Sequence, residues 1–237
     1  MDSSEFDSEN QTERSYRTDL HYNGSRNAGA EELEDDEEEI QMSSQEVLEA
    51  LQRAWINEKF APDVLPYEDA LVEMVMIQLV HMEENLATAN KNDLLYIVHR
   101  MEVERIRFIV ASYLRCRLQK LETYASHILD VESDRPPNLK RLSEAEQKFT
   151  HDFHGIVETH FHELVTRHMP QNHQDDERVR RVVPNLNSHV FVRARRDVGE
   201  YSFANGEHSV NIRAGAVHLL RYRDIERLVI EGLLELI

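Results

Sequence analysis

Residues 104–122 read ERIRFIVASYLRCRLQKLE, and this stretch decides what kind of fold the chain adopts. At about 100° per residue its apolar side chains form one arc of roughly 200°, with Arg117 near the middle. A surface helix of a globular domain needs an apolar stripe only a little wider than about 100°. Phe108 lies on the far side, in a second stripe with Leu94, Ile97 and Met101. We therefore expect a long helix whose extra apolar surface is covered by another polypeptide. The arc comprises Ile106, Ile109, Val110, Tyr113, Leu114, Cys116, Leu118 and Leu121.

The sequence around this stretch predicts a helical domain of about four helices, one of them long. Ser43 with Glu46, and Ser143 with Glu146, have the spacing of a capping box, in which a serine and a glutamate satisfy the free amides of a helix start. Asn92 or Asp93 is suited to cap the long helix, and Pro170 stops the last one. The predicted helices span about residues 43–57, 68–89, 93–129 and 143–168.

After Pro170 the pattern changes to short runs rich in β-branched and aromatic residues, separated by turn signals. We expect strands near residues 179–183, 189–192, 201–203, 209–212 and 216–222, then a short helix capped by Asp224 and a closing strand at 233–237. The predicted fold class is α+β. Its organisation is a helical domain at residues 43–170, a linker at 171–182 and a small β-rich domain at 183–237.

The charge of the chain is concentrated at its N-terminus. Residues 1–40 carry 14 acids and three arginines, a net charge of −11 out of −18 for all 237 residues. Such a segment has too little apolar surface to offset its ordering entropy, so we expect a disordered acidic tail at residues 1–42. The tail is either an inert solubilising extension or a docking arm for a partner. Net acidity also argues against sequence-independent binding to duplex DNA, so we expect any DNA contact to be indirect or weak.

The residues that carry catalysis or bind metals do not form a recognised pattern. The 13 histidines include several on the predicted helix at 143–168, but none has the spacing of a zinc-protease helix, and one cysteine cannot form an internal disulfide. There is no glycine-rich phosphate loop and no serine nucleophile motif. We therefore predict a protein that is not an enzyme and needs no cofactor or metal. No run is long and apolar enough to span a membrane, and we expect a soluble intracellular protein without membrane contact.

Arg117 is the charged residue that needs explanation, because an unpaired guanidinium inside an apolar arc is costly. The planar, five-donor head of arginine suits a buried or interfacial carboxylate. We expect a partner on a neighbouring helix, with Glu58 and Glu83 as the candidates within this chain. Whether the partner lies in this chain or in another one is left open by the sequence.

Several segments together resemble the Sld-five family of GINS complex subunits. They run in family order from about residue 44 to residue 237: AWINEKFAPDVL at 54–65, HMEENL at 81–86, ERIRF with SYLRCRL at 104–118, HMP at 168–170, SHVFVRAR at 188–195 and AVHLLRYRDI with LLELI at 216–237. The helical domain coming before the β-rich domain is also the order found in this half of the GINS family.

The resemblance implies a nuclear, non-catalytic subunit of an obligate heterotetramer with three other GINS subunits. It also implies partnership with the Cdc forty-five protein and the minichromosome maintenance ring in the replicative helicase, acting in initiation and elongation of replication. In some relatives the acidic tail engages a trimeric polymerase-linking hub. The alternative function is a DNA-binding or chromatin-binding adaptor that uses the basic segment around Arg193, Arg195 and Arg196. We expect the subunit interface to include Trp55, Phe60, Glu83, Arg105, Phe108, Tyr113, Arg117, Leu118, Leu236 and Ile237.

Overall fold

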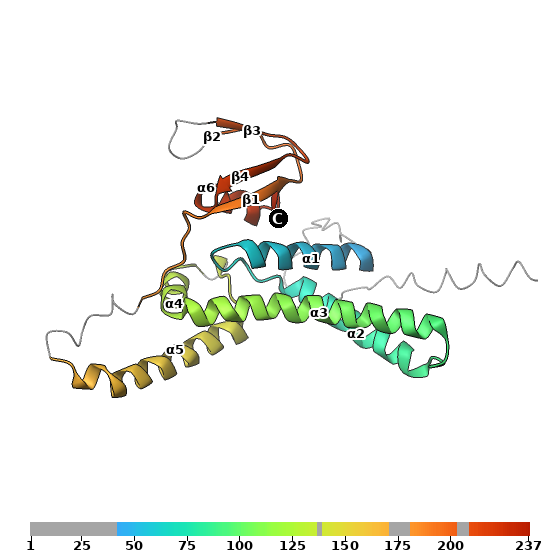
Figure 1. Ribbon diagram of the computed structural model, residues 1–237, viewed down its shortest axis with the longest axis horizontal. Helices are drawn as coiled ribbons and strands as arrows, with labels where there is room; N and C mark the ends of the chain where they lie inside the picture. The colour runs from blue at the N-terminus through green and yellow to red at the C-terminus, as the bar shows by residue number, and fades with distance from the viewer. Residues whose placement is uncertain (1–41, 137–138, 171–180, 203–208) are drawn as a thin grey trace, which may run out of the picture.

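The computed structural model describes residues 42–136, 139–170, 181–202 and 209–237, and confirms the predicted α+β class (Figure 1). A bundle of elongated helices comes first, and a small β-rich part follows it. The predicted tail at 1–42 lies outside the described residues except for its last residue, and the linker at 171–182 lies outside them except for residues 181 and 182. The helical elements are α1 (Ser44–Phe60), α2 (Asp69–Thr88), α3 (Leu94–Thr123), α4 (Ala125–Ser133), α5 (Glu144–Leu164) and a 3-10 turn, η3 (Thr166–His168).

Capping residues mark the starts of α1, α3 and α5 at the predicted positions. Ser43 accepts a hydrogen bond from the Glu46 amide while the Glu46 carboxylate accepts one from the Ser43 amide, and Ser143 and Glu146 repeat the arrangement at α5. Asp93 caps α3 by accepting from the Leu95 amide at 3.3 Å. These bonds satisfy amides that have no partner within the helix.

Three predicted helix ends were wrong. The last helix, predicted to end at residue 168, ends at Leu164 and is followed by the 3-10 turn η3. The long helix does not continue to residue 129 but ends at Thr123, because Tyr124 (φ −114°, ψ 22°) leaves helical geometry and α4 begins at Ala125. The break turns Ile128 toward Val64 and Leu121, with which it forms a buried cluster. The bundle thus has five α-helices among the described residues instead of about four. In addition, α1 extends to Phe60, beyond the predicted end at residue 57.

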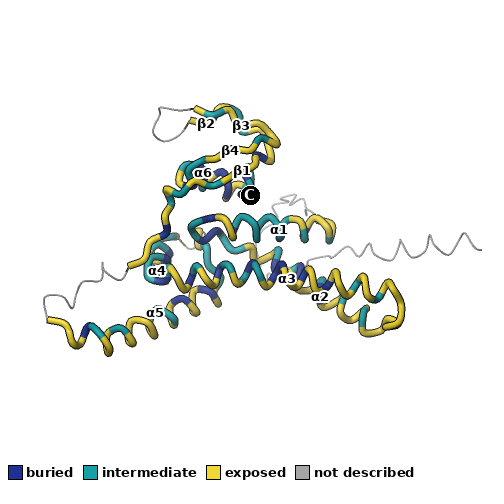
Figure 2. Tube along the Cα trace, in the orientation of Figure 1, coloured by how far each residue is buried: buried dark blue, intermediate teal, exposed yellow. Residues whose placement is uncertain are grey.

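The main helical core lies where α1, α2 and α3 meet. Val47 and Leu51 of α1 contact apolar residues of α2 and α3. These two residues are four positions apart, so they lie on the same face of α1. Cys116, which belongs to the apolar arc of α3, is only partly buried. Figure 2 shows that burial is concentrated at the centre of the bundle, whereas the far end of the α2–α3 hairpin and the outer half of α5 are exposed. No helix among the described residues has the length and apolarity that a membrane crossing requires.

The β-rich part contains a three-stranded antiparallel sheet in the order β4-β1-β5 and a separate β2-β3 pair. Helix α6 buries Tyr222, Ile225 and Val229 in the same core as Val192 of β1. The remaining bounds are β1 (His189–Ala194), β2 (Gly199–Ser202), β3 (Ser209–Ile212), β4 (Val217–Arg221), α6 (Tyr222–Ile230) and β5 (Leu234–Leu236).

Two local predictions in this part were also wrong. A strand was expected at residues 179–183. Residues 179 and 180 lie outside the described residues. Residues 181–183 form no strand, because Val182 and Val183 are exposed and pair with no neighbour. Asp224 does not cap α6, because it lies in the first turn of the helix and accepts a hydrogen bond from Arg221. The N-cap residue is Arg221, and its side chain makes no capping hydrogen bond. An acid in the first turn is still favourable there, because the N-terminal end of a helix carries partial positive charge.

Candidate functional site

Arg117 lies at the centre of the helical bundle with a relative exposure of 0%. Its Nε and Nη2 donate to the two carboxylate oxygens of Glu146 on α5, at 2.7 and 2.9 Å. Its Nη1 donates to Glu58 of α1 at 3.1 Å and to the Leu65 carbonyl at 2.7 Å, and Nη2 also donates to the Arg141 carbonyl at 3.1 Å. All five guanidinium N–H groups therefore have an acceptor.

The surroundings of Arg117 keep it charged. Burial by itself lowers the pKa of Arg117, but the hydrogen bonds to Glu146 and the charge of Glu58 outweigh burial and raise this pKa above its ordinary value. The guanidinium carbon also lies 5.1 Å from the ring centre of Tyr67 and 5.8 Å from that of Tyr113. Cation–π contact of this kind stabilises a desolvated cation. Arg117 thus fixes the relative positions of α1, α3 and α5.

Glu58 is the second member of this network and is also 0% exposed. Its carboxylate accepts from Lys120 of α3 at 2.7 Å and from the Leu65 amide at 3.3 Å, in addition to Arg117. Burial lowers the pKa of Lys120, and the charge of Glu58 opposes that effect. The predicted partnership of Arg117 with Glu58 is therefore present within the chain. Glu83, the other candidate, instead pairs with Arg107 at the surface, where such a pair contributes little to stability.

Arg141, in the connection between α4 and α5, joins the helical bundle to the β-rich part. It donates to Asp63 at 3.0 Å and to the Val64 carbonyl at 3.1 Å on one side, and to Glu226 of α6 at 2.5 Å on the other. Asn57 of α1 accepts from the Leu236 amide of β5 at 2.8 Å. The core of the β-rich part moreover includes Ala61 and Leu65, from the connection that follows α1. The two parts are thus docked through polar contacts and a shared apolar core.

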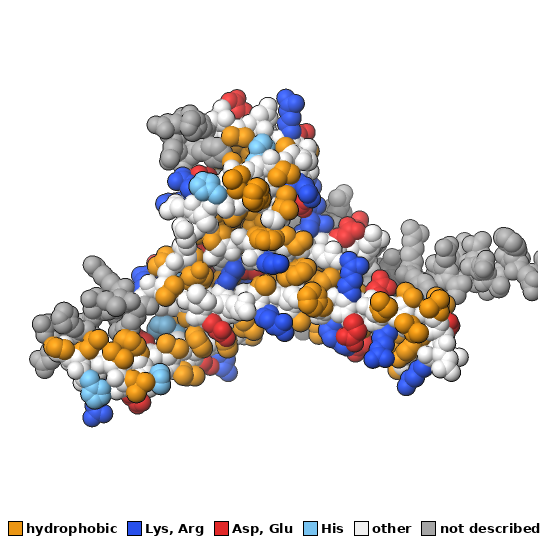
Figure 3. Space-filling model, in the orientation of Figure 1, with side chains coloured by type: hydrophobic (Ala, Val, Ile, Leu, Met, Phe, Trp, Pro, Cys, Tyr) orange, Lys and Arg blue, Asp and Glu red, His pale blue; other side chains and the backbone are white. Residues whose placement is uncertain are grey.

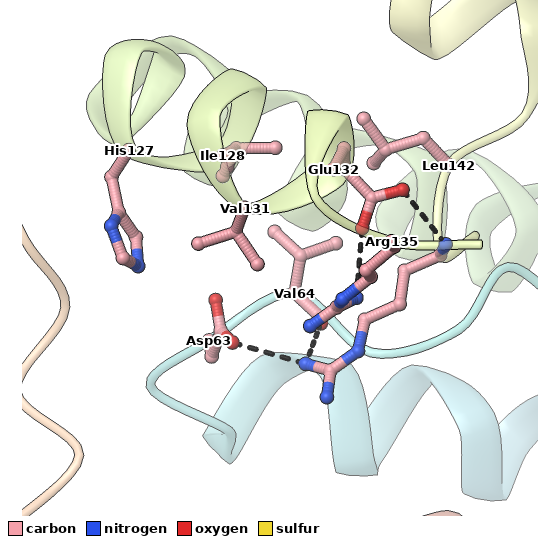
Figure 4. Close-up of a pocket in the computed structure, with 9 residues that line it drawn as sticks. Asp63, Val64, His127, Ile128, Val131, Glu132, Arg135 and Leu142 are labelled. Carbon is pink, nitrogen blue, oxygen red and sulfur yellow. Dashed lines mark hydrogen bonds and ion pairs between the residues drawn. The ribbon is translucent and has the colours of Figure 1, made fainter. Parts of the chain in front are cut away.

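Two small cavities lie among the described residues. Figure 4 shows the one beside Arg141, lined among others by Asp63, His127 and Glu132. Its volume of about 20 Å³ is room for roughly one water molecule. A second cavity of about 140 Å³ lies between α1, α3 and α6, next to Glu58 and Tyr113. No group of three or more metal-ligating side chains is found in the described ranges.

Exposed apolar side chains cover two regions of the helices. The first is the far end of the α2–α3 hairpin, where the exposed fractions range from 46% to 72%, and the second is the outer half of α5. Figure 3 shows hydrophobic side chains gathered at both ends of the elongated bundle. The hairpin-end surface comprises Met76, Ile77, Val80, Leu94, Leu95, Ile97, Val98 and Met101, and the α5 surface comprises Ile156, Val157 and Leu164.

The ten interface residues predicted from the sequence fall into two groups. Tyr113, Arg117 and Leu236 are at most 2% exposed, because residues of this chain already enclose their side chains. The other seven reach the surface at least in part. Trp55 is half-buried and meets the exposed ring of Phe108 edge to face at 6.0 Å. The exposed or partly exposed set is Trp55, Phe60, Glu83, Arg105, Phe108, Leu118 and Ile237.

Sequence reasoning missed Glu146, Arg141 and Asn57, which complete the buried network and the docking contact. Glu146 was found only as a capping residue, yet its carboxylate accepts from the Ser143 amide and from Arg117 together. Arg141 follows a turn and has no helical periodicity that would indicate burial. Asn57 lies 179 positions from the residue it binds. No local signal in the sequence marks these three roles.

Two family models match the chain. The model described as "GINS complex protein helical bundle domain" matches residues 73–165, and the model described as "DNA replication complex GINS protein SLD5 C-terminus" matches residues 184–237. These ranges cover most of the helical bundle and the whole β-rich part that docks on it.

Curated relatives from distant organisms agree with these models. The "DNA replication complex GINS protein SLD5" of Rattus norvegicus is 42% identical over 207 residues, covering 84% of this chain and 93% of the relative. The protein of that name from Homo sapiens is 40% identical with the same coverage, and the one from Arabidopsis thaliana is 32% identical over 84% of this chain and 94% of the relative. The chain therefore belongs to the SLD5 family of GINS complex proteins.

Proposed function

We propose that this chain is a non-catalytic scaffold subunit that assembles with three other GINS subunits into a heterotetramer. In this proposal the tetramer acts in the nucleus with the Cdc forty-five protein and the minichromosome maintenance ring, as part of the replicative helicase in initiation and elongation. Two units carry the function, a helical one at residues 43–170 and a β-rich one at residues 183–237. Family membership supports the proposal, and one structural observation carries it: the bundle exposes apolar side chains at both of its ends.

The hairpin-end surface is the stronger of the two supports. Leu94 is 72% exposed and Met101 68%, yet both lie on α3, whose opposite face is buried in the bundle. Monomeric proteins rarely expose contiguous apolar patches larger than a few hundred Å². Obligate interfaces, by contrast, are large and resemble a domain core divided in two. The surface therefore suits permanent burial against a partner subunit, with Phe108 and the half-buried Trp55 at its border.

The α5 surface supports the same conclusion independently. At about 100° per residue, Phe149, Phe153, Ile156 and Leu164 lie on one side of α5, the side that also holds the buried Glu146 and Thr150. The first half of this stripe packs in the bundle, whereas the second half projects past it (Figure 1). Because the stripe continues beyond the helices that cover its beginning, a helix of another subunit is the natural cover for its end.

Co-expression with the three sister subunits tests the proposal. The expected product is a soluble complex whose mass equals one copy of each chain, whereas this chain alone should aggregate or self-associate through its exposed apolar surfaces. Met101→Glu should abolish or strongly weaken assembly, because it places a charge in the buried interface.

The matched control is Gln119→Glu, which adds the same single charge on an exposed position of α3. Both variants should keep the helicity of the wild type, since neither side chain is buried in this chain. The proposal fails if this chain behaves alone as a cooperatively melting monomer and its mass does not change on co-expression. It also fails if Met101→Glu and Gln119→Glu assemble equally well.

A further inference from the structure

The outer face of the β4-β1-β5 sheet carries a row of exposed apolar side chains. Along β1, Val192 and Ala194 are buried in the core, so Phe191 and Arg193 point to the opposite face. Phe191 is paired with Leu219 of β4, and the Ile237 amide donates to the Phe191 carbonyl at 3.0 Å. The row Leu219, Phe191, Ile237 therefore runs from β4 across β1 to the residue that follows β5, with exposed fractions of 53%, 58% and 40%. Figure 3 shows hydrophobic side chains gathered on this part of the molecule.

The edge of β4 beside this row is open. The Ala194 amide donates to the Ala216 carbonyl at 3.0 Å, and the Tyr222 amide donates to the Ser188 carbonyl at 2.9 Å. In an antiparallel pair these bonds recur at every second residue, so the backbone groups of Val217 and Leu219 point away from β1. In the part of the sheet that the structure describes, β4 is an edge strand without a neighbour on that side.

The opposite edge of the sheet differs, because Asn57 of α1 accepts the outward amide of Leu236. Folded proteins commonly protect an exposed edge with lysine, proline or a covering segment. The β4 sequence VHLLR contains neither lysine nor proline. The open edge is therefore suited to pair with another extended chain.

The charge next to the apolar row is net positive, because Glu235, the acid on this face of β5, already pairs with Arg193 at 3.3 Å. Arg195 continues the outward-facing series of β1, and its amide donates to the Leu233 carbonyl at 3.0 Å. Arg196 and Arg213 lie in the adjoining turns, and for these three arginines no ion pair with a carboxylate is found among the described residues. Asp197, the acid nearest in sequence, instead accepts from the Ala214 amide at 2.7 Å. In a chain of net charge −18, this corner is a local site for an acidic group.

We propose that the β4 edge and the outer sheet face bind an extended segment of a partner protein, with apolar residues at every second position and acidic residues at the end that lies beside Arg195. The segment adds to the sheet as a strand beside β4, and its backbone bonds to the outward groups of Val217 and Leu219. Its apolar side chains cover the row centred on Phe191, and its acids meet Arg195, Arg196 and Arg213. This surface is separate from the helical surfaces assigned to the other GINS subunits, so the inference goes beyond the proposed function.

A direct binding titration tests the proposal. The probe is a fluorescein-labelled ten-residue peptide with leucine at alternate positions, serine between the leucines and three glutamates at one end. It is titrated against the full chain in its co-expressed complex, and binding is read by fluorescence anisotropy. Leu219→Pro removes an amide that makes no bond to β1 and should be tolerated in an edge strand. Leu219→Pro and Arg195→Glu should each weaken binding at least about tenfold. The control is Arg227→Glu, on the exposed face of α6 next to Glu231, which should change binding less than about twofold.

The outcomes separate the proposal from its alternatives. Loss of peptide binding in Arg195→Glu together with Leu219→Pro supports strand addition, and Leu219→Ser replaces the proline variant if that variant does not enter the complex. Unchanged affinity in Arg195→Glu and in the position 219 variant overturns the proposal, as does the absence of measurable binding to wild type. Equal binding of the same peptide with lysines in place of its three glutamates would also overturn it. Tighter binding of a short DNA duplex that is lost in Arg195→Glu would show that the corner recognises nucleic acid instead.

Discussion

Replacing Arg117 with alanine should destabilise the protein more than any other single arginine substitution on α3. The change removes five hydrogen bonds and the cation that neutralises two buried carboxylates. Lys120 remains within 2.7 Å of Glu58, so Glu146 becomes the carboxylate without a cation. Removing one partner of a buried ion pair typically costs about 3 to 5 kcal/mol.

The thermal midpoint of the assembled complex, measured at fixed concentration, is the appropriate readout. For a chain of this size each kcal/mol corresponds to about 2 to 4 °C, so Arg117→Ala should lower the midpoint by about 6 to 20 °C or prevent folding. Arg107→Ala is the matched control, because Arg107 lies on the same helix but pairs with Glu83 at the surface. That exposed pair is worth about 0 to 1 kcal/mol, so the control should move the midpoint by less than about 4 °C.

A small shift in Arg117→Ala would refute the reasoning. If the midpoints of the two variants agree within about 2 °C, the buried network does not hold the helices together. If Arg117→Ala fails to fold, Arg117→Met, which fills a similar space, separates packing from charge. The methionine variant should fold better than the alanine variant only if packing matters more than charge. Equal failure of the alanine and methionine variants supports the electrostatic explanation.

Three further outcomes follow from the burial of individual side chains. The Tyr222 hydroxyl is buried and has no hydrogen-bond partner among the described residues, so Tyr222→Phe should leave stability unchanged or raise it by about 1 kcal/mol. Tyr113→Phe, by contrast, loses the bond from the Glu68 amide and should cost about 0.5 to 1.5 kcal/mol. Thermal unfolding measures both effects. Burial raises the pKa of Tyr113 and of Tyr222 above the ordinary value. Above pH about 10 the unfolded tyrosines therefore release protons that the folded ones keep, so the midpoint should fall with rising pH, and less steeply in Tyr222→Phe; a parallel dependence would contradict this. Deleting residues 234–237 removes Leu234 and Leu236, whose burial stabilises the protein by about 1.5 to 3 kcal/mol each. Proteolysis should then cleave the β-rich part, while circular dichroism still reports the helices. The control is Ile237→Ala, at an exposed position, which should remain resistant to the protease.

The sequence by itself determined the features that depend on neighbours within about four residues. The capping boxes at Ser43 and Ser143, the exposed stripe containing Phe108 and Met101, and the alternation of β1 all follow from such local spacing. The prediction that Arg117 needs an acidic partner belongs here too, because its place in an apolar arc is a local fact. The family resemblance could be read from short segments for the same reason.

The tertiary structure alone decided which distant groups meet. Arg117 binds Glu146, 29 positions away, and Arg141 binds Glu226, 85 positions away, because the connection between α4 and α5 passes beside both α3 and α6. The break at Tyr124 likewise depends on packing, since Ile128 reaches Val64 only if α3 ends there. Helical periodicity gives the direction of a side chain but not the path of the connections. The buried location of Tyr113 and Leu236, and the docking of the β-rich part on α1, therefore required the three-dimensional arrangement.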